Sequence, residues 1–180
     1  MTDTDAIIAE TTRWLERAVI GLNLCPFAKA VHVKGQIRYA VCTAGTRDAL
    51  LAALLRELQF LVDADPEVTE TTLLIHPNVL ADFLDYNDFL SVAVAAISEL
   101  QLDGEIQIAS FHPQYQFADT APDDISNYTN RSPYPTLHLL REASVTRAVA
   151  AFADARDIFE HNIETMNRLG HAGWKALGNG

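Results

Sequence analysis

Apolar residues recur at two different spacings along the chain, and each spacing predicts one kind of secondary structure. Apolar positions three and four residues apart are typical of helices with one buried face, whereas short alternating or continuous apolar runs are typical of strands. The helical spacing predicts helices over residues 4–21, 46–64, 87–101, 144–152 and 154–169, and the strand patterns predict strands over 36–44, 71–77, 105–113 and 136–142. Helices and strands therefore alternate along most of the chain.

This alternation favours an α/β fold, with one domain over residues 1–180. We expect a mixed, mainly parallel sheet of about four strands flanked by helices. The fourth strand has no helix before it, so we expect it to run antiparallel, and an edge of the sheet is one position open to it. A loop of more than 20 residues precedes this strand. Loops of this length are mostly functional or disordered, and aromatic residues that can pin the loop favour a functional one.

Charge and cysteine content narrow the class of protein. The formal net charge of −11 disfavours nucleic acid and anionic membranes as partners, because both need a basic footprint on the protein. The N-terminal segment lacks the apolar core of a secretory signal, and no apolar stretch approaches the ~20 residues that span a bilayer. We therefore expect an acidic, soluble, cytoplasmic protein with two reduced cysteines. Whether it forms a homo-oligomer is left open.

Two His-Pro pairs end the second and third predicted strands, at His76 and His112. If these strands are parallel, the two imidazoles reach the carboxyl edge of the sheet, where open α/β sheets place their ligands. Because imidazole titrates near neutral pH, His112 is our candidate general acid/base, and His76 is the candidate second proton donor or ligand. In the alternative interpretation, each ring only hydrogen-bonds to loop backbone.

The long loop that starts after His112 carries further candidates for catalysis and binding. Either Asp123 or Asp124 can orient the histidine while the other caps a turn. Arg131 is the candidate anion clamp, because a planar guanidinium matches a carboxylate or a phosphate. Asn127 and Asn130 either orient a polar ligand or fix the loop.

Two other residues complete the candidate ligand-binding set. Tyr115 lies in the same loop and can pin it to the body of the protein. Cys25 lies in the turn LCPF, where an exposed thiol paired with a histidine can act as a nucleophile. Burial is the alternative for this cysteine, because a lone cysteine usually packs as a small apolar residue.

The cofactor is unknown from the sequence, and a divalent metal is left open. His76, His112 and His138 together with one aspartate would supply a ligand set suited to zinc, iron or manganese. No HExxH or CxxC motif supports such a site, and the chain lacks a glycine-rich phosphate loop and a GxSxG motif. Several large classes of enzyme are thereby excluded.

The segments GLNLCPFA, FHPQYQF, DDISNYTNRSPYPTLHLLRE and RLGHAGWKAL resemble those of an uncharacterised bacterial family, domain of unknown function 1415. The resemblance covers nearly the whole chain and implies a single-domain protein. It brings no established activity with it, so no residue gains a catalytic role from it.

The leading hypothesis from the residues is an enzyme that acts on a small polar or anionic metabolite by histidine acid/base chemistry, with a hydrolase-like or metal-assisted reaction left open. The alternative is a non-catalytic domain whose long loop closes over a ligand or a protein partner.

Overall fold

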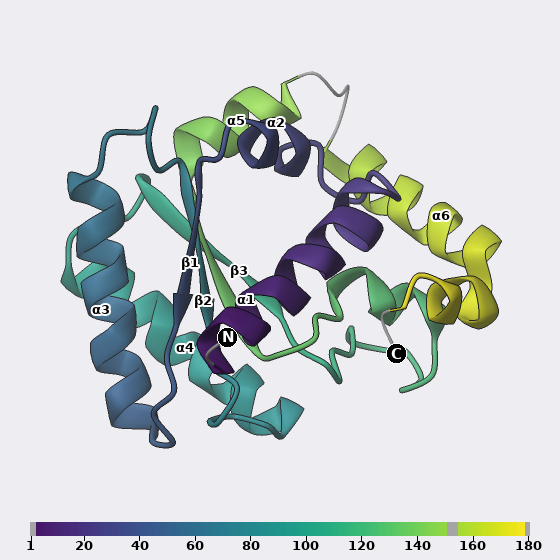
Figure 1. Cartoon of the computed structure of the whole chain (residues 1–180), viewed down its shortest axis with the longest axis horizontal. Coiled ribbons are helices and arrows are strands. Elements are labelled where there is room, and N and C mark those ends of the chain that lie inside the picture. Colours follow the sequence, from purple (N-terminus) through teal and green to yellow (C-terminus); the bar gives the residue numbers. More distant parts are fainter. Residues whose placement is uncertain (1–2, 151–154, 179–180) are drawn as a thin grey trace.

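Four strands form one mixed sheet in the computed structural model, which describes residues 3–150 and 155–178 (Figure 1). The strands are β1 (Ile37–Val41), β2 (Thr71–Ile75), β3 (Ile106–Phe111) and β4 (Thr136–Arg141), in the order β1-β2-β4-β3. Strand β1 pairs with β2 in parallel, whereas β4 pairs with β2 and with β3 in antiparallel fashion. The expectation of a mainly parallel sheet is therefore wrong, since two of the three pairings between the described strands are antiparallel.

The central position of β4 explains this difference. This strand is antiparallel as expected, but it lies between β2 and β3 instead of at an edge. Leu139 and its neighbour Leu140 point to opposite faces of the sheet and are both buried, as is typical of a strand that is covered on both faces. Since β2 and β3 are both antiparallel to β4, their carboxyl ends meet the start of β4 at one edge of the sheet.

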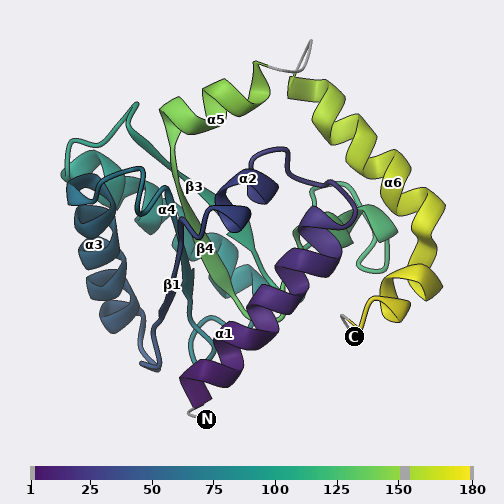
Figure 2. The ribbon, with the colours of Figure 1, turned by 45° about the horizontal axis from the view of Figure 1, so that its top comes forward.

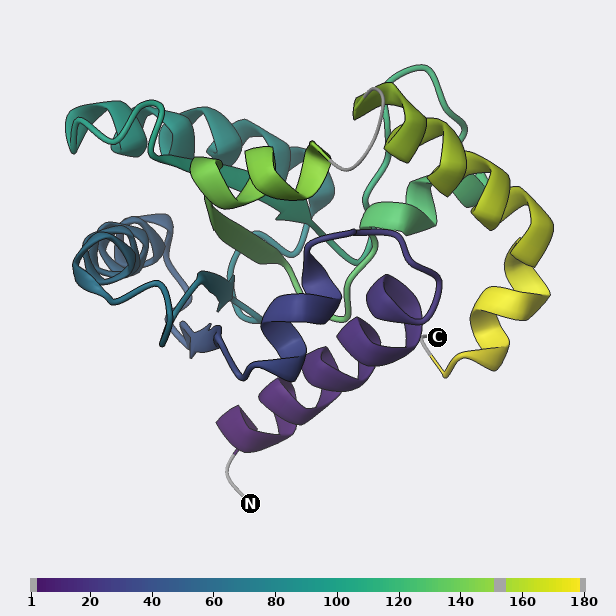
Figure 3. The same ribbon diagram turned by 90° about the horizontal axis from the view of Figure 1, so that it is seen from above.

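Helices α3 (Arg47–Asp63) and α4 (Phe83–Glu99) cover one face of the sheet and bury most of the leucine-rich core there (Figure 3). The Thr46 side chain caps α3 by accepting the N–H of Ala49. Helix α4 begins earlier than the apolar spacing predicts. Asp82 accepts the first backbone N–H groups of this helix, and such a side-chain cap stabilises a helix start.

The other face of the sheet is covered by the N-terminal part of the chain (Figure 3). Helix α1 (Asp3–Trp14) continues as the π-helix η1 (Leu15–Ile20), and α2 (Ala28–Val33) follows after a turn. The apolar spacing does not predict α2, because six residues are too few to display a helical period. A second apolar cluster on this face joins Trp14 of α1 to Met166 and Trp174.

The last two helices lie along the outside of the protein (Figure 2). Helix α5 (Glu142–Val149) follows β4 directly, and α6 (Ala155–Ala176) packs on the 3-10 helix η2 (Ile125–Asn130) of the long loop. The helix start predicted at Asp154 lies outside the described residues. Gly170 interrupts α6 with φ 65° and ψ 174°, at the position where the sequence predicts an end. None of the described helices has the length and apolar character needed to cross a membrane.

Candidate functional site

The two His-Pro corners reach the same edge of the sheet, as the sequence predicts, with the start of β4 between them. The backbone N–H of His76 donates to the carbonyl of Pro135 at 3.0 Å, and that of His112 donates to the carbonyl of Asn130 at 3.2 Å. Both imidazoles lie against the ring of Tyr86, with centroid distances of 5.8 Å and 5.0 Å. The corners therefore form one cluster on the α4 face of the sheet.

Both imidazoles are fully buried, and backbone groups hold them. Nδ1 of His76 donates to the carbonyl of Val79 at 3.0 Å. Nδ1 of His112 accepts the N–H of Gln114 at 3.0 Å, so its Nε2 carries the proton and donates to the carbonyl of Leu80 at 3.0 Å. The two rings thus fasten the same turn, in which Leu80 adopts an uncommon positive φ of 60°. Nε2 of His76 has no hydrogen-bond partner among the described residues.

Burial also controls the charge of these rings. Desolvation lowers the pKa of His76 to about 4, despite the hydrogen bond to Val79 that raises it. Desolvation likewise lowers the pKa of His112, against the opposite effects of Leu80 and the Asp82 carboxylate. Both imidazoles are therefore neutral at neutral pH. The acid/base role expected of His112 stays a prediction, whereas bonding of each ring to loop backbone is what the geometry displays.

Tyr86 is the residue of this cluster that sequence reasoning missed. Its hydroxyl donates to the carbonyl of Thr136 at 2.7 Å and accepts the N–H of Phe111 at 3.0 Å. Tyr86 therefore connects the last residue of β3 to the first residue of β4. Burial raises the pKa of this phenol strongly, so the hydroxyl stays protonated. No sequence motif marks the residue, because its partners are backbone groups distant in the chain.

The loop asparagines fix the loop. The buried Asn127 side chain accepts the N–H of Phe117 at 2.8 Å and the hydroxyl of Thr120 at 2.9 Å, and it donates to a carbonyl of the same loop. Asn130 donates to the carbonyl of Ser110 at 3.0 Å. These contacts match the loop-fixing interpretation of the two residues.

The two loop aspartates lie at the surface, and hydrogen bonds to a neighbouring residue hold the carboxylate of one of them, Asp124. Asp124 caps η2 by accepting the N–H and the hydroxyl of Ser126, as expected of one of the pair, and these bonds lower the pKa of its carboxyl group. Asp123 is exposed, and its backbone carbonyl accepts a hydrogen bond from His171 at 2.7 Å. Within residues 3–150 and 155–178, neither carboxylate forms a hydrogen bond or an ion pair with His112.

Tyr115, Cys25 and His138 occupy three different environments. Tyr115 packs against Phe83 and Phe117 inside the loop. Cys25 and His138 line a small apolar cavity of about 30 Å³ beneath α1 and α2. Burial raises the pKa of the Cys25 thiol, so the thiol is protonated at neutral pH.

The three candidate metal-ligating histidines do not converge. Nε2 of His138 lies 2.8 Å from the hydroxyl of Thr71, on the sheet face opposite to Tyr86 and its two imidazoles. Within residues 3–150 and 155–178, no group of three histidine, cysteine, aspartate or glutamate side chains has a geometry that could hold a metal ion. The donor set predicted from the sequence therefore does not fit a metal centre.

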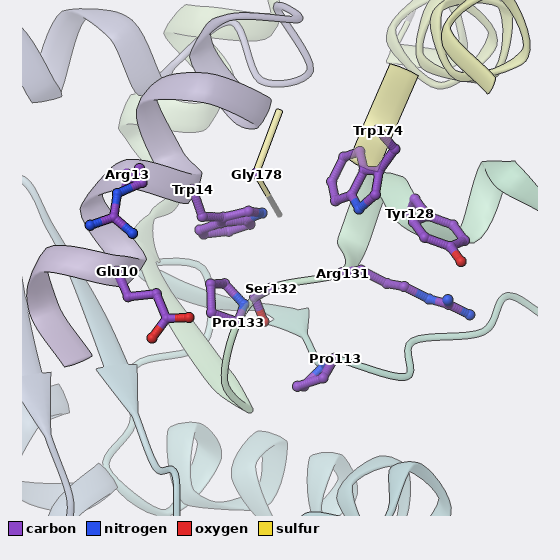
Figure 4. Close-up of a pocket in the computed structure, with 10 residues that line it drawn as sticks. All are labelled: Glu10, Arg13, Trp14, Pro113, Tyr128, Arg131, Ser132, Pro133, Trp174 and Gly178. Carbon is purple, nitrogen blue, oxygen red and sulfur yellow. The ribbon is translucent and has the colours of Figure 1, made fainter. Parts of the chain in front are cut away.

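A cleft of about 240 Å³ lies elsewhere, between α1, the segment 128–133 and the end of α6 (Figure 4). Its lining consists of Glu10, Arg13, Trp14, Pro113, Tyr128, Arg131, Ser132, Pro133, Trp174 and Gly178. Of the residues predicted from the sequence, only Arg131 lines it. Both tryptophans of the chain contribute to it. We call this space the tryptophan cleft.

The charged side chains lie at the two ends of the tryptophan cleft (Figure 4). At one end, Glu10 accepts a short hydrogen bond from Tyr134, which raises the pKa of this phenol to about 12. Arg13 lies beside Glu10, is exposed, and forms no hydrogen bond or ion pair with any residue that the structure describes. At the other end, Arg131 stacks over Tyr128, with its guanidinium carbon 4.1 Å from the ring centroid.

Backbone carbonyls hold the Arg131 guanidinium in place. Its Nε donates to the carbonyl of Tyr115 at 3.2 Å, and its Nη2 donates to that of Pro122 at 2.6 Å. Arginine recognition of an anion benefits from such pre-organisation. Arg131 thus adds a fixed positive charge to one end of the cleft, while Arg13 leaves its guanidinium available at the other.

The sequence does not indicate Arg13, Trp14 and Trp174 as site residues, because they come together only through tertiary contacts. Trp14 lies on the buried stripe of α1, where an aromatic residue is expected to serve the core, and Trp174 lies beyond the Gly170 break. The occurrence of both tryptophans at the two ends of the chain is the only available signal, and by itself it does not indicate a site.

Comparison with known proteins yields one match. The family model described as a protein of unknown function, DUF1415, matches residues 6–176. No curated protein and no solved structure shows a significant match.

Proposed function

The chain belongs to the DUF1415 family of proteins of unknown function, and we propose that it binds a small anionic ligand in the tryptophan cleft. The observation that carries this proposal is a local excess of positive charge. The charged lining residues are two arginines and one glutamate, a net charge of +1, in a chain whose formal net charge is −11. A positive concave site on an acidic protein favours anions over cations.

Arg13 has the features of the anion-binding residue. Its guanidinium lacks an acceptor among the described residues, although Glu10 lies beside it in the cleft (Figure 4). Tyr134 already donates to Glu10, which reduces the tendency of this carboxylate to attract a cation. An incoming carboxylate or phosphate would therefore gain two parallel hydrogen bonds from Arg13.

Histidine acid/base chemistry at the sheet edge is the second candidate, and no observation favours it. His112 would have to give up a bond to Leu80 or to Gln114 before either nitrogen could exchange a proton with a substrate. Nε2 of His76 is free of such bonds among the described residues, but the whole side chain is buried. We therefore rank ligand binding first.

Tryptophan fluorescence tests the proposal, because both emitters of the chain line the cleft. The wild type would be titrated separately with acetate, succinate, inorganic phosphate and benzoate. We expect at least one anion to change the emission to a saturating level. Arg13→Gln should weaken that anion about tenfold or more, since a charge-assisted pair contributes about 1.5–3 kcal/mol.

Arg56→Gln is the matched control, because Arg56 is an exposed arginine on α3, away from the tryptophan cleft. It should leave the affinity within about twofold of the wild type, since surface charges contribute little to binding at a distance. The proposal is wrong if none of the four anions changes the emission of the wild type, or if both variants bind the same anion equally well.

A further inference from the structure

Another hollow lies at the edge of the sheet opposite to the two His-Pro corners. Leu140 near the end of β4 pairs there with Thr71 at the start of β2. Figure 2 shows α2 and α5 at this end of the sheet, and both helices contribute to the hollow. The hollow has a volume of about 320 Å³, and its lining includes Phe27, Val31, Lys34, Glu67, Glu70 and Arg147. We call it the Glu70 hollow. None of these residues lines the tryptophan cleft, so the two sites are separate.

Glu70 is a buried carboxylate with one oxygen engaged and the other open. The residue is 8% exposed and comes directly before β2. Its Oε1 accepts a hydrogen bond from the hydroxyl of Ser144 and lies 3.4 Å from Nη2 of Arg147. Its Oε2 accepts no hydrogen bond from any residue that the structure describes and is not sealed off by protein, so it faces the hollow that Glu70 lines. A carboxylate that is held largely out of water is stabilised by a hydrogen-bond donor at such an oxygen.

The charges of the Glu70 hollow are balanced. Two basic residues, Lys34 and Arg147, line it together with two acidic ones, Glu67 and Glu70. The Arg147 side chain is 70% exposed, and among the described residues only its Nη2 has partners, Ser144 at 3.0 Å and Glu70. Lys34 is exposed, and its ammonium group forms no hydrogen bond or ion pair with a described residue. Because donors and acceptors of opposite charge share one hollow, its lining favours a zwitterion over a simple anion or cation.

The spacing of these charges limits the zwitterion further. Glu70 and Arg147 are direct neighbours, with Oε1 and Nη2 3.4 Å apart. A ligand that meets both side chains therefore carries its own two charges close together. The α-amino and α-carboxyl groups of an amino acid meet this condition, because they share one carbon atom.

One wall of the Glu70 hollow is apolar. It consists of side chains from α2 and the turn before it, among them Phe27 and Val31. An apolar group that lies against this wall is removed from water, which favours binding. The volume of about 320 Å³ is at the lower limit of the about 300–1,000 Å³ of small-molecule sites. The hollow therefore suits a small zwitterion that also has an apolar part.

We propose that the Glu70 hollow binds a free α-amino acid with an apolar side chain. The ammonium group of the ligand donates to Oε2 of Glu70, and its carboxylate pairs with Arg147 and Lys34. Its side chain lies against Phe27 and Val31. This site is independent of the tryptophan cleft and of the anion proposed there, and no reaction is assigned to it.

Isothermal titration calorimetry of the wild-type protein with four probes tests each contact. L-Leucine has the ammonium group, the carboxylate and the apolar side chain. Glycine lacks the side chain, 4-methylpentanoate lacks the ammonium group, and 3-methylbutylamine lacks the carboxylate. We expect L-leucine to bind at least about tenfold more tightly than each of the other three, because each of them loses one of the three contacts.

Each other outcome overturns a defined part. Equal binding of L-leucine and 4-methylpentanoate would overturn the contact with Glu70, and equal binding of L-leucine and 3-methylbutylamine would overturn the pairing with Arg147 and Lys34. Equal binding of L-leucine and glycine would overturn the role of the apolar wall. If L-leucine does not bind, the Glu70 hollow is not an amino acid site, whatever the anion titrations of the tryptophan cleft give.

Three variants locate the bound amino acid. Glu70→Gln keeps an acceptor for the Ser144 hydroxyl but removes the charge, so it should weaken L-leucine about tenfold or more. Glu164→Gln changes an exposed glutamate on α6 and should stay within about twofold of the wild type. Arg13→Gln, in the tryptophan cleft, should also stay within about twofold. If Arg13→Gln weakens L-leucine and Glu70→Gln does not, the amino acid occupies the tryptophan cleft and the proposal is wrong. The comparison of the four probes decides the question if Glu70→Gln does not fold.

Discussion

Buried neutral histidines should make this protein lose stability in mild acid, and His76 allows the effect to be measured. In the folded chain its pKa is lowered from 6.5 to about 4, mainly by burial. The unfolded chain therefore binds a proton at its imidazole as the pH falls below about 6.5, whereas the folded chain resists protonation until about pH 4. The stabilising effect of a neutral His76 is fully present above pH 6.5 and is lost progressively between these two values.

The magnitude follows from the difference between the two pKa values. Each pKa unit corresponds to about 1.4 kcal/mol. Between about pH 7.5 and about pH 5, the free energy of unfolding should fall by about 2 kcal/mol through His76 alone. The loss should reach about 3 kcal/mol at about pH 4 and level off at about 3.5 kcal/mol at lower pH.

Urea denaturation of the wild type and of two histidine variants, at about pH 7.5 and at about pH 5, measures the contribution of His76 to this loss of stability. In His76→Asn, the amide can still donate to the carbonyl of Val79, but the side chain no longer titrates. This variant should lose about 2 kcal/mol less than the wild type on acidification. His161→Asn changes an exposed histidine and should follow the wild type. If His76→Asn and the wild type lose the same free energy, the imidazole does not carry the effect.

Two further substitutions test how the fold is held and how the cleft is built. Arg141 donates to three carbonyls at the end of α3 and beyond, those of residues 61, 64 and 69. Arg141→Met should therefore lower the free energy of unfolding by about 2–3 kcal/mol in urea denaturation. Its control, Arg47→Met, removes an exposed ion pair and should lower the free energy of unfolding by less than about 1 kcal/mol. Equal effects would contradict this role of Arg141. Gly170 has open space around its missing side chain but adopts φ 65° and ψ 174°, so Gly170→Ala should destabilise the fold by about 1–3 kcal/mol through backbone strain and alter tryptophan emission. Gly45→Ala is its control at a position without a positive φ, and an unchanged urea midpoint in Gly170→Ala would show that the break in α6 is not needed.

Local sequence patterns predicted the parts of the fold that depend on local physics. The four strands, the two central helices and the break at Gly170 follow from apolar spacing, proline and glycine. The meeting of His76 and His112 at one edge also followed, because each histidine ends a strand and the strands run in the same direction.

The remaining features depend on contacts between distant parts of the chain. The insertion of β4 between β2 and β3 reflects nonlocal pairing, which no local pattern encodes. The role of each histidine depends on carbonyl groups in a turn with a strained residue, Leu80. The tryptophan cleft needs the two ends of the chain side by side, so a search for short motifs cannot find it.

The indole N–H signals in a two-dimensional proton–nitrogen NMR spectrum test the central proposal most directly. The chain contains two tryptophans, and both line the cleft, so each indole signal comes from a cleft residue. Addition of benzoate should shift both signals to a saturating value in the wild type and in Arg56→Gln, with a much weaker response in Arg13→Gln. If neither indole signal moves with benzoate, acetate, succinate or phosphate, the tryptophan cleft is not an anion-binding site.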